Sequence, residues 1–486
     1  MDLANVGRQA RNDTEARAIR SVMVQKREAL RCIEREMAQL AENKRGIEED
    51  LDRLGVALTP YICSLLPNEV LSHIFILLAQ DHGPAEFPIQ EDNTPPQLTI
   101  SQVSSRWRRV ALGTPELWSD TYLIYPRKTP RHIIRLHQQW LSRARAFPVT
   151  LSIWFNRFSD SSDELASALQ SILFATQVKR LSLRLAYTQF IALSTLLAIH
   201  LSAFELDVIF PFINADLSMN DPHPLVNRLQ SVTFRFDERS IEALNWIDSL
   251  RPWLPWSQLR SLNFNITVMD LHLIFSILRQ TPMLETLTLS MVGSGVLEPL
   301  IMPLLRTLVM NIDTSMPDDC TQILRSFTCP SLTKFSLITY GTWTDGIVEI
   351  LKQQYNMQQL REFKLDGNYA LRLSSFLRSG PMLSSLSLRL AEMDDEAIIG
   401  ISNGSLGRFL KRLLIDTDYD VGDLLGMVEA RKKTVDELIK NGCTWREKIT
   451  VLRDVVIHSK DHKGYKERIT ALKESGIAIT FLNPRW

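Results

Sequence analysis

The feature that most constrains this chain is the repeated pattern L-x-x-L-x-L, or a close variant of it. Ten such segments begin at Val178, Leu201, Leu229, Leu259, Leu284, Leu305, Leu332, Leu360, Leu383 and Leu410, at intervals of 21 to 30 residues. Four of them follow a proline placed two residues earlier, at Pro282, Pro303, Pro330 and Pro381. Proline at that place ends a helix and favours extended backbone. A single repeat cannot bury its own apolar face, but stacked repeats share one continuous core. The sequence therefore predicts a solenoid with one strand in each repeat.

The spacing of the segments resembles that of leucine-rich repeats. The resemblance implies an α/β fold, a curved solenoid over 148–486 with parallel strands on the concave face and helices on the convex face. Helical patterns at 163–177 and 345–356 separate strands, and 148–155 and 476–482 are the expected first and last strands. The Asn that the family carries after the last Leu fits at Asn368 and is missing from most repeats. The repeats are therefore irregular, and their curvature does not follow from the sequence.

Two apolar segments precede the repeats, LPNEVLSHIFILL at 66–78 and VSSRWRRVALGTPELW at 103–118. In the first, Pro67 and Glu69 favour a helix start, and the helix is apolar on almost every side. Such a helix must be buried in its own domain or against a partner. Apolar residues around the second segment recur at three and four residues, as one stripe of another helix: Ile100, Val103, Trp107, Val110 and Ala111. Because so short a pair buries a low fraction of its surface, it indicates a protein partner.

The pair resembles the F-box, through LP-x-E-V-L-x-x-I-F at 66–75, V-S-x-R-W-R at 103–108 and T-P-E-L-W at 114–118. In that family the module docks on a Skp-type adaptor, which hangs from a cullin scaffold in a ubiquitin ligase. By this resemblance, the residues at or just beneath the adaptor interface would be Leu66, Pro67, Val70, Leu71, Ile74 and Trp107. The F-box would span 61–125. It departs from the family in a Pro-rich, acidic insert at 79–97, which is expected to be a solvated loop.

A heptad pattern predicts a coiled coil at 15–58. Its two registers hold Ala16, Met23, Leu30, Met37 and Leu51, and Ile19, Ile33, Leu40, Ile47 and Leu54, with Lys44 and Lys26 as interruptions. The helix either associates, as a homodimer or with a partner helix, or packs back on its own F-box. We expect a disordered tail at 1–14, a helix break at Pro60 and a linker helix within 126–147. The order of heptad, F-box and repeats resembles a group of fungal F-box proteins.

Composition argues against several classes of function. The 55 Lys and Arg balance the 55 Asp and Glu, so no net field attracts nucleic acid or an anionic membrane. The apolar stretch 191–204 is too short to span a bilayer, and the amino terminus lacks the apolar core of a secretory signal. Five scattered cysteines without C-x-x-C favour reduced thiols and a cytoplasmic or nuclear protein. No cluster of residues predicts a cofactor, a metal or a catalytic site.

Three weaker signals are better explained as structure. G-I-S-N-G at 400–404 matches the G-x-S-x-G of serine hydrolases, but a helix-like run precedes Ser402 where that chemistry needs a strand. A Gly-containing helix end is therefore expected there. His458 and His462 lie in a polar segment that indicates a solvated loop and not a metal site. The arginines beside Trp107 are expected on the solvent-exposed face of the F-box helix, and we do not expect them to bind nucleic acid.

Residues between the leucines of each strand point to the concave face. The basic ones are Arg180, Arg184, Arg235, Lys334, Lys364, Arg389 and Arg412, and the acidic ones are Glu362, Asp366 and Asp416. An excess of positive charge on a neutral protein favours an acidic or phosphorylated target, which the seven basic residues would bind. The alternative is that these charges form only a solvated surface.

These features predict a non-catalytic substrate receptor. The F-box would attach the chain to a ligase, and the repeats would hold a target protein near the ubiquitin donor, so that a raised effective concentration drives the transfer. One alternative is an interaction scaffold that uses the coiled coil and the solenoid without any ligase. A more distant one is a serine hydrolase that relies on Ser402. The identity of the target does not follow from the sequence.

Overall fold

The computed structural model describes residues 13–89, 93–125, 131–155, 169–170, 172–173, 177–186, 189–190, 193, 197, 205–210, 229–236, 254–265, 271–292, 297–313, 317–343, 345–369, 373–391, 394–416, 420–441, 449–458 and 463–482. The chain divides into two compact units, Met1–Ile74 and Phe75–Trp486, and the boundary lies within a helix. Across the described ranges, no helix is both long and apolar enough to cross a membrane.

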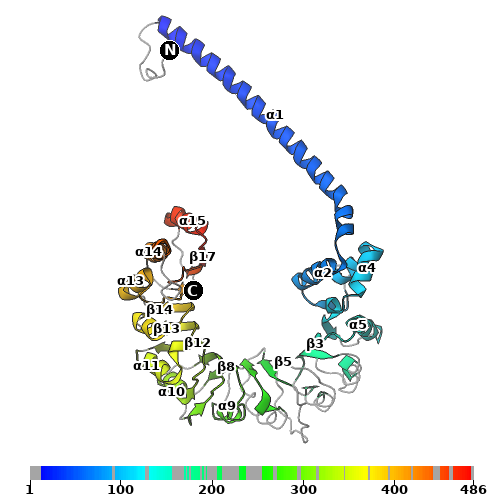
Figure 1. The fold of residues 1–486 in the computed structure, drawn as a ribbon, viewed down its shortest axis with the longest axis vertical. Helices are drawn as coiled ribbons and strands as arrows, with labels where there is room; N and C mark the ends of the chain where they lie inside the picture. The colour runs from blue at the N-terminus through cyan, green and yellow to red at the C-terminus, as the bar shows by residue number, and fades with distance from the viewer. Residues whose placement is uncertain are drawn as a thin grey trace. The chain divides into compact units, whose positions relative to one another are not determined.

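One long helix, α1 (Asp13–Leu65), makes up most of the first unit (Figure 1). Ion pairs one turn apart support it, such as Lys44 to Glu48 with 3.5 Å between Nζ and Oε1. The heptad side chains from Ile19 onward are exposed, by 37% at Ile19 and by 67% at Leu54. The structure therefore shows the helix that the heptad predicts, with its apolar seam uncovered.

The ends of α1 differ from those expected. The helix continues through Pro60 to Leu65, so the proline does not end it. A proline inside a helix removes one backbone hydrogen bond and crowds the carbonyl four residues earlier, yet α1 remains helical across this position. At the other end, Asp13 and Thr14 already belong to the helix although they fall in the expected tail. The remainder of that tail, 1–12, lies outside the described residues.

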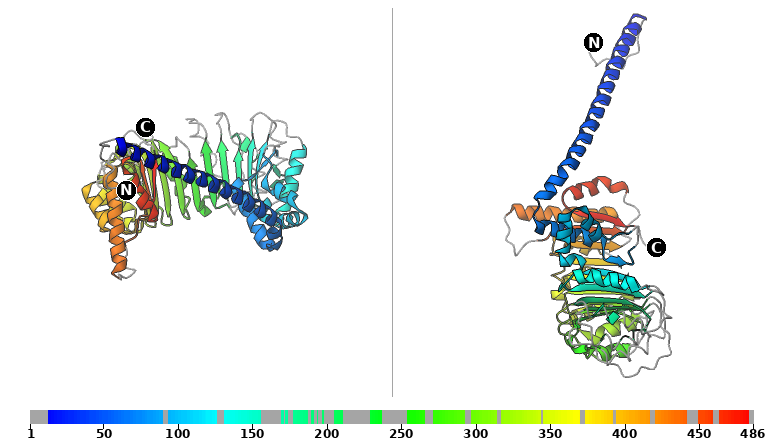
Figure 2. Two further views of the ribbon diagram at one scale, coloured as in Figure 1. Left: turned by 90° about the horizontal axis from the view of Figure 1, so that it is seen from above. Right: turned by 90° about the vertical axis from the view of Figure 1, so that its right-hand side faces the viewer.

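Short helices alternate with parallel strands in the second unit (Figures 1 and 2). The helices are α2 (Asn68–His82, which begins in the first unit), α3 (Pro96–Val103), α4 (Ser105–Leu112), η2 (Pro115–Trp118), α5 (Arg131–Arg143), η4 (Trp256–Gln258), α9 (Leu271–Leu278), α10 (Pro317–Ser326), α11 (Asp345–Gln354), η5 (Met357–Gln359), α12 (Leu373–Ser379), α13 (Asp395–Asn403), α14 (Val421–Lys440), η7 (Lys463–Tyr465) and α15 (Lys466–Glu474). The strands are β1 (Ala85–Phe87), β2 (Asp120–Tyr125), β3 (Val149–Phe155), β4 (Val178–Arg184), β5 (Glu205–Phe210), β6 (Ser231–Phe236), β7 (Ser261–Asn265), β8 (Thr286–Val292), β9 (Leu300–Ile301), β10 (Thr307–Asp313), β11 (Phe327–Thr328), β12 (Lys334–Trp343), β13 (Glu362–Tyr369), β14 (Ser385–Ala391), β15 (Arg412–Asp416), β16 (Asp454–His458) and β17 (Ala478–Leu482).

Fifteen of these strands form one sheet in chain order, and β9 and β11 pair separately. The register places the repeat leucines opposite one another, as in the row Leu262, Leu287 and Leu308, all of which are fully buried. Each of the ten repeat segments leads into one of these strands. Within this unit the sheet curves, with strands on the inside and α9, α10, α11 and α13 on the outside (Figure 1). The α/β solenoid expected from the sequence is confirmed.

The insert at 79–97 is not the solvated loop that we expected. Its first residues complete α2, Ala85–Phe87 form β1, and Pro96 begins α3. β1 pairs with β2 in parallel, with Phe87 opposite Leu123. Ala85 and Phe87 are buried, with exposed fractions of 3% and 2%. A strand of three residues between prolines carries too short an alternation to be recognised.

The boundaries of the sheet also differ from expectation at several points. The segment 148–155 forms β3, which is the third strand because β1 and β2 precede it. β16 lies outside the ten expected segments, since the 20-residue helix α14 lengthens the repeat before it and breaks the period. The last strand, β17, lies where 476–482 was expected. The helical pattern at 345–356 corresponds to α11, whereas most of 163–177 lies outside the described residues.

The expected linker helix is α5, and it closes the first end of the sheet. Its Trp140 packs edge-on against Trp118 of η2 and Phe87 of β1, with ring centroids 4.7 and 5.2 Å apart. His137, one turn earlier, is fully buried and hydrogen bonds with Thr121 Oγ1 through Nε2 at 3.1 Å. Burial lowers the pKa of His137 to about 4, so the imidazole is neutral at physiological pH.

A buried arginine on α14 organises the other end. Arg431 is fully buried, and its guanidinium donates to the carbonyls of Thr450 (2.9 Å), Ile401 (2.8 Å), Gly407 (2.7 Å) and Arg408 (3.0 Å). Burial lowers its pKa to about 10, and the group remains charged at neutral pH. One side chain thereby joins α14, the end of α13 and the segment that leads into β16.

Candidate functional site

Helix α2 has one apolar face that is buried and another that is exposed to solvent. Glu69 lies in its first turn, and His82 in its last turn contacts the Leu78 carbonyl through Nδ1 at 2.8 Å, so both ends suit the helix dipole. Leu71 and Phe75 lie one turn apart and are each only 1% exposed. They form the buried face of the helix, and Ala79 continues the same face.

The adjacent face of α2 carries large apolar side chains that remain in solvent. Val70, Ile74, Leu77 and Leu78 are exposed by 41%, 43%, 52% and 40%. Their spacing of four, seven and eight residues from Val70 places them on one side of a helix. Single exposed apolar residues are ordinary, but a stripe along one helix indicates a surface for a partner.

The second apolar segment forms two helices and not the single helix that we expected. Ser104 has extended backbone angles, with φ −156° and ψ 164°, and separates α3 from α4. Its hydroxyl accepts a hydrogen bond from the Trp107 amide at 3.1 Å and thereby caps α4. The apolar spacing across 100–111 is real, but serine's preference for a helix start outweighs it at this position.

Aromatic and apolar groups of α3 and α4 lie partly at the surface. The half-buried Trp107 packs against Phe75, with 5.0 Å between ring centroids. Val103 and Leu112 are exposed by 58% and 40%. Below them Trp118 is fully buried and donates from Nε1 to the Ala111 carbonyl at 2.8 Å. Leu117 and Trp118, which end the T-P-E-L-W motif, are therefore part of the core.

The concave face of the sheet is the second candidate site, and its charges are largely paired. Arg180 bridges to Glu205 with 2.6 Å between Nε and Oε2, and Arg235 pairs with Asp207. Two further pairs join neighbouring strands, Lys334 with Glu362 at 2.9 Å and Arg412 with Asp454 at 4.0 Å. Arg184 lies over the Trp154 ring, 4.2 Å from its centroid. Lys364 is exposed, and the side chain of Arg389 lies outside the described part of the structure.

The expected excess of positive charge on this face is not present. The strand register adds five acidic positions to the three expected from the sequence, namely Glu86, Asp120, Glu205, Asp207 and Asp454. With Glu362, Asp366 and Asp416, the described strands carry eight acidic positions against seven basic ones. Strands β1, β2 and β16 lie outside the ten repeat segments, and β5 belongs to the irregular repeat that begins at Leu201.

Comparison with known proteins identifies the helical segment. Residues 63–124 match the family described as F-box-like. They form an F-box-like domain. Among solved structures, the chain is similar to an internalin (InlF) from Listeria monocytogenes, at 14% identity and a TM-score of 0.34, over 80% of this chain and 94% of that one. It is also similar to TLR13 in a complex with ssRNA13, at 14% identity and a TM-score of 0.30, over 63% of this chain and 41% of that one. No curated protein matches the sequence.

Within the F-box-like domain, the six expected interface residues fall into three groups. Pro67, Val70 and Ile74 are exposed, Leu66 and Trp107 are half-buried, and Leu71 is buried in the core. The expected interface did not include Leu77, Leu78, Val103 and Leu112, although all four are exposed. Helical spacing from Val70 could have identified Leu77 and Leu78. The exposure of Val103 and Leu112 could not be predicted in this way, because it depends on the break between α3 and α4 at Ser104.

The enzyme-like signals are accounted for by helix geometry and burial. Ser402 lies in the last turn of α13, where its hydroxyl donates to the Ile398 carbonyl at 2.7 Å. Gly404 follows with φ +74°, the left-handed ending that glycine favours. Burial raises the pKa of Cys320 and Cys329 to about 12, which keeps both thiols unreactive. Among the described residues no group of three or more potential metal ligands converges. His458 lies on β16, and His462 lies outside the described ranges.

Proposed function

We propose that this chain is the substrate-recognition subunit of a Skp–cullin–F-box type ubiquitin ligase. The observation that carries the proposal is the exposed apolar face of α2 within an F-box-like domain. A Skp-type adaptor would cover Val70, Ile74, Leu77 and Leu78, and burial of each such side chain contributes about 1.5–3 kcal/mol. The adaptor would then connect the chain to a cullin scaffold.

The chain's role in this proposal is tethering and not catalysis. The solenoid would hold a target protein beside the ubiquitin donor, and the raised effective concentration would accelerate transfer without a nucleophile from this chain. Such complexes act in the cytoplasm or nucleus, which fits the free thiols of Cys32, Cys320 and Cys329.

Co-purification with a Skp-type adaptor tests the proposal. Substitution of Val70 and Ile74 by Asp should abolish adaptor binding, because two charges would enter the apolar contact. The triple change of Leu66, Pro67 and Ile74 to Ala should weaken it as well. The matched control is Ile399→Asp, since Ile399 is 62% exposed on α13 and lies outside the domain. Adaptor binding that survives the α2 changes would contradict the ligase role and leave the non-ligase interaction scaffold as the explanation.

The exposed seam of α1 supports a second element of the proposal, self-association as a coiled coil. Nine of its ten apolar heptad residues, all except Ala16, are exposed by more than a third, and a second copy of the helix would bury them. Sedimentation of the full chain should show a concentration-dependent dimer that Leu30→Asp with Leu40→Asp removes. A monomer at every concentration would favour a partner helix or packing on the chain's own F-box-like domain.

A further inference from the structure

A continuous row of residues crosses the repeats where the strands begin. It consists of the residue that follows the first leucine of successive repeats: Arg260, Glu285, Arg306, Thr333, Arg361, Ser384, Lys411 and Arg453. Each amide from Glu285 onward donates to the carbonyl of the preceding member, at 2.7–2.9 Å. The row is therefore fixed by the backbone, with about 4.8 Å between neighbours.

Four cations of this row form no ion pair with any residue that the structure describes, whereas most cations of the concave face are paired. Arg306, Arg361, Lys411 and Arg453, here called the edge cations, are all exposed. No ion pair joins them to any described residue, and Glu285, the acid in the row, is bound by Arg260 with 2.5 Å between Nη1 and Oε1. Thr333 and Ser384 stand between the edge cations and add no charge. The row thus presents positive charge that the described chain does not neutralise.

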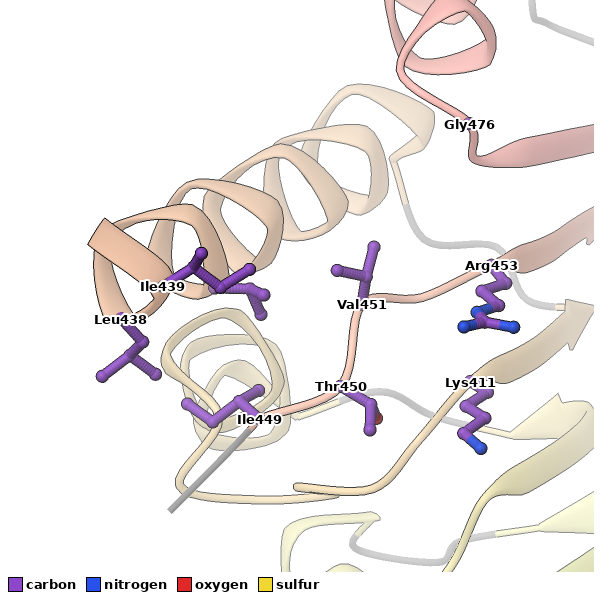
Figure 3. A pocket seen from close by; sticks show the side chains of 9 residues that line it. Lys411, Leu438, Ile439, Ile449, Thr450, Val451, Arg453 and Gly476 are labelled. Carbon is purple, nitrogen blue, oxygen red and sulfur yellow. The ribbon is translucent and has the colours of Figure 1, made fainter. Parts of the chain in front are cut away.

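The last two edge cations border an apolar cavity of 540 Å³ (Figure 3). Its lining includes Leu438 and Ile439 of α14 and Ile449 and Val451 of the segment before β16. In Figure 3, Lys411 and Arg453 lie at one end of the cavity, and Leu438, Ile439 and Ile449 lie at the other. The cavity therefore combines an apolar pocket with an adjacent pair of cations.

The wall of this cavity is held in place by the buried arginine of α14. Arg431 donates from Nε to the Thr450 carbonyl at 2.9 Å, and the Thr450 hydroxyl lies 3.1 Å from the Leu410 carbonyl. The strand starts on the other side are joined by the hydrogen bond from the Arg453 amide to the Lys411 carbonyl, at 2.7 Å. Because one wall is fixed by side-chain to backbone hydrogen bonds and the other by a backbone hydrogen bond, the cavity is preorganised for a ligand.

We propose that this edge binds an acidic, extended segment of a partner polypeptide. An aliphatic side chain of the segment fills the cavity, and the carboxylates that follow it lie along the edge cations. The apolar lining favours a polypeptide over nucleic acid, because an aliphatic group beside a run of charge is common in acidic peptides and absent from a phosphate backbone. This inference goes beyond the ligase role, since the edge residues lie on β-strand starts far in sequence from the F-box-like domain.

Fluorescence anisotropy with the full chain tests the inference. The probe is a labelled peptide of a leucine pair followed by a run of glutamates, and the control peptide carries glutamines instead. Reversal of charge in Lys411→Glu with Arg453→Glu should weaken binding of the glutamate peptide by about tenfold or more. Added salt should also weaken it, since exposed charges are screened over about 8–10 Å. The matched control is Arg235→Glu on the concave face, which should leave the affinity unchanged.

A second variant separates the pocket from the charges. Val451→Asp should weaken binding of the leucine-containing peptide more than that of a peptide of glutamates alone. Equal binding of the glutamate and glutamine peptides, or an unchanged affinity after charge reversal, would overturn the inference. Displacement of the peptide by a single-stranded oligonucleotide that binds more tightly would replace it with a nucleic-acid surface. These variants should leave co-purification with the adaptor unchanged. The experiments therefore test peptide binding at the edge cations separately from the proposed ligase role.

Discussion

The two ends of the fifteen-stranded sheet are closed around buried nitrogen groups in different states of charge. At the first end, His137 is neutral, with one hydrogen bond to Thr121 and its pKa lowered to about 4. Near the last end, Arg431 stays charged and donates to four carbonyls. Both side chains are fully buried. A buried charge needs a nearly complete set of acceptors, whereas a group that can lose its proton needs only one.

This difference has a consequence for stability. The neutral imidazole makes the first end sensitive to acid, because protonation would place an uncompensated charge among Phe87, Trp118 and Trp140. The guanidinium cannot be titrated in the physiological range, so the last end depends on the presence of the side chain and not on pH. The sheet is thus stabilised at one end by a histidine whose charge changes with pH, and at the other end by an arginine that stays charged.

The largest effect is expected from Arg431→Met. The substitution leaves four carbonyls without their donor, and the repeats near α14 should lose about 3 kcal/mol or more of stability. Since repeats are coupled mainly to their neighbours, the loss should be local. Hydrogen exchange should accelerate in β15 and β16 and remain unchanged in β7 and β8. Uniform acceleration across the sheet would show that the last end is not a separate element of stability.

Acidification should produce the next largest effect, at the first end. Because the pKa of His137 in the fold, about 4, is below its ordinary value of 6.5, the unfolded chain takes up the proton first. Stability is complete above pH 6.5 and falls towards pH 4, by about 1.4 kcal/mol for each pH unit. Urea unfolding across this range should show the loss, and His137→Leu should flatten it. An equally steep decline in the variant would assign the acid sensitivity to other groups.

The smallest effects should come from the half-buried arginines that flank each end. Arg143 lies over the Trp118 ring at 4.4 Å, and Arg468 forms a two-point pair with Glu429 at 2.8 Å. Each is partly in solvent, so Arg143→Ala and Arg468→Ala should each lower stability by less than about 1 kcal/mol. Melting temperatures that fall as far as in Arg431→Met would remove the distinction between buried and peripheral groups.

The repeats could be predicted from the sequence because their signal is periodic and apolar. Leucines that recur at fixed spacing must be buried, and all ten segments lead into strands. The F-box-like helix α2 was predictable for the same reason. The strand β1 and the caps at both ends were not, since they depend on single side chains such as His137 and Arg431 whose partners are distant in sequence.

The charged surfaces were harder to predict than the core. The repeat pattern alone makes the concave face look basic. Glu205 and Asp207 lie in the irregular repeat that begins at Leu201, Asp454 lies outside the ten segments, and only the register reveals the pairing of these acids. The edge cations could not be predicted from the repeat pattern. The pattern shows which leucines are buried, but it does not show that the residue after the first leucine is exposed. A count of charges therefore says less about a binding surface than the identity of their neighbours.

The pairing of β1 with β2 has a practical consequence for any attempt to separate the modules of this chain. The insert between the F-box helices contributes the outermost strand of the sheet, so a cut after residue 125 would remove β1 and β2 together. The solenoid that remained would begin at β3, with an unpaired strand edge and Leu151 and Ile153 newly accessible. Open edges of this kind promote aggregation. A fusion that joins these repeats to another module should therefore keep the insert and β2 together with the solenoid.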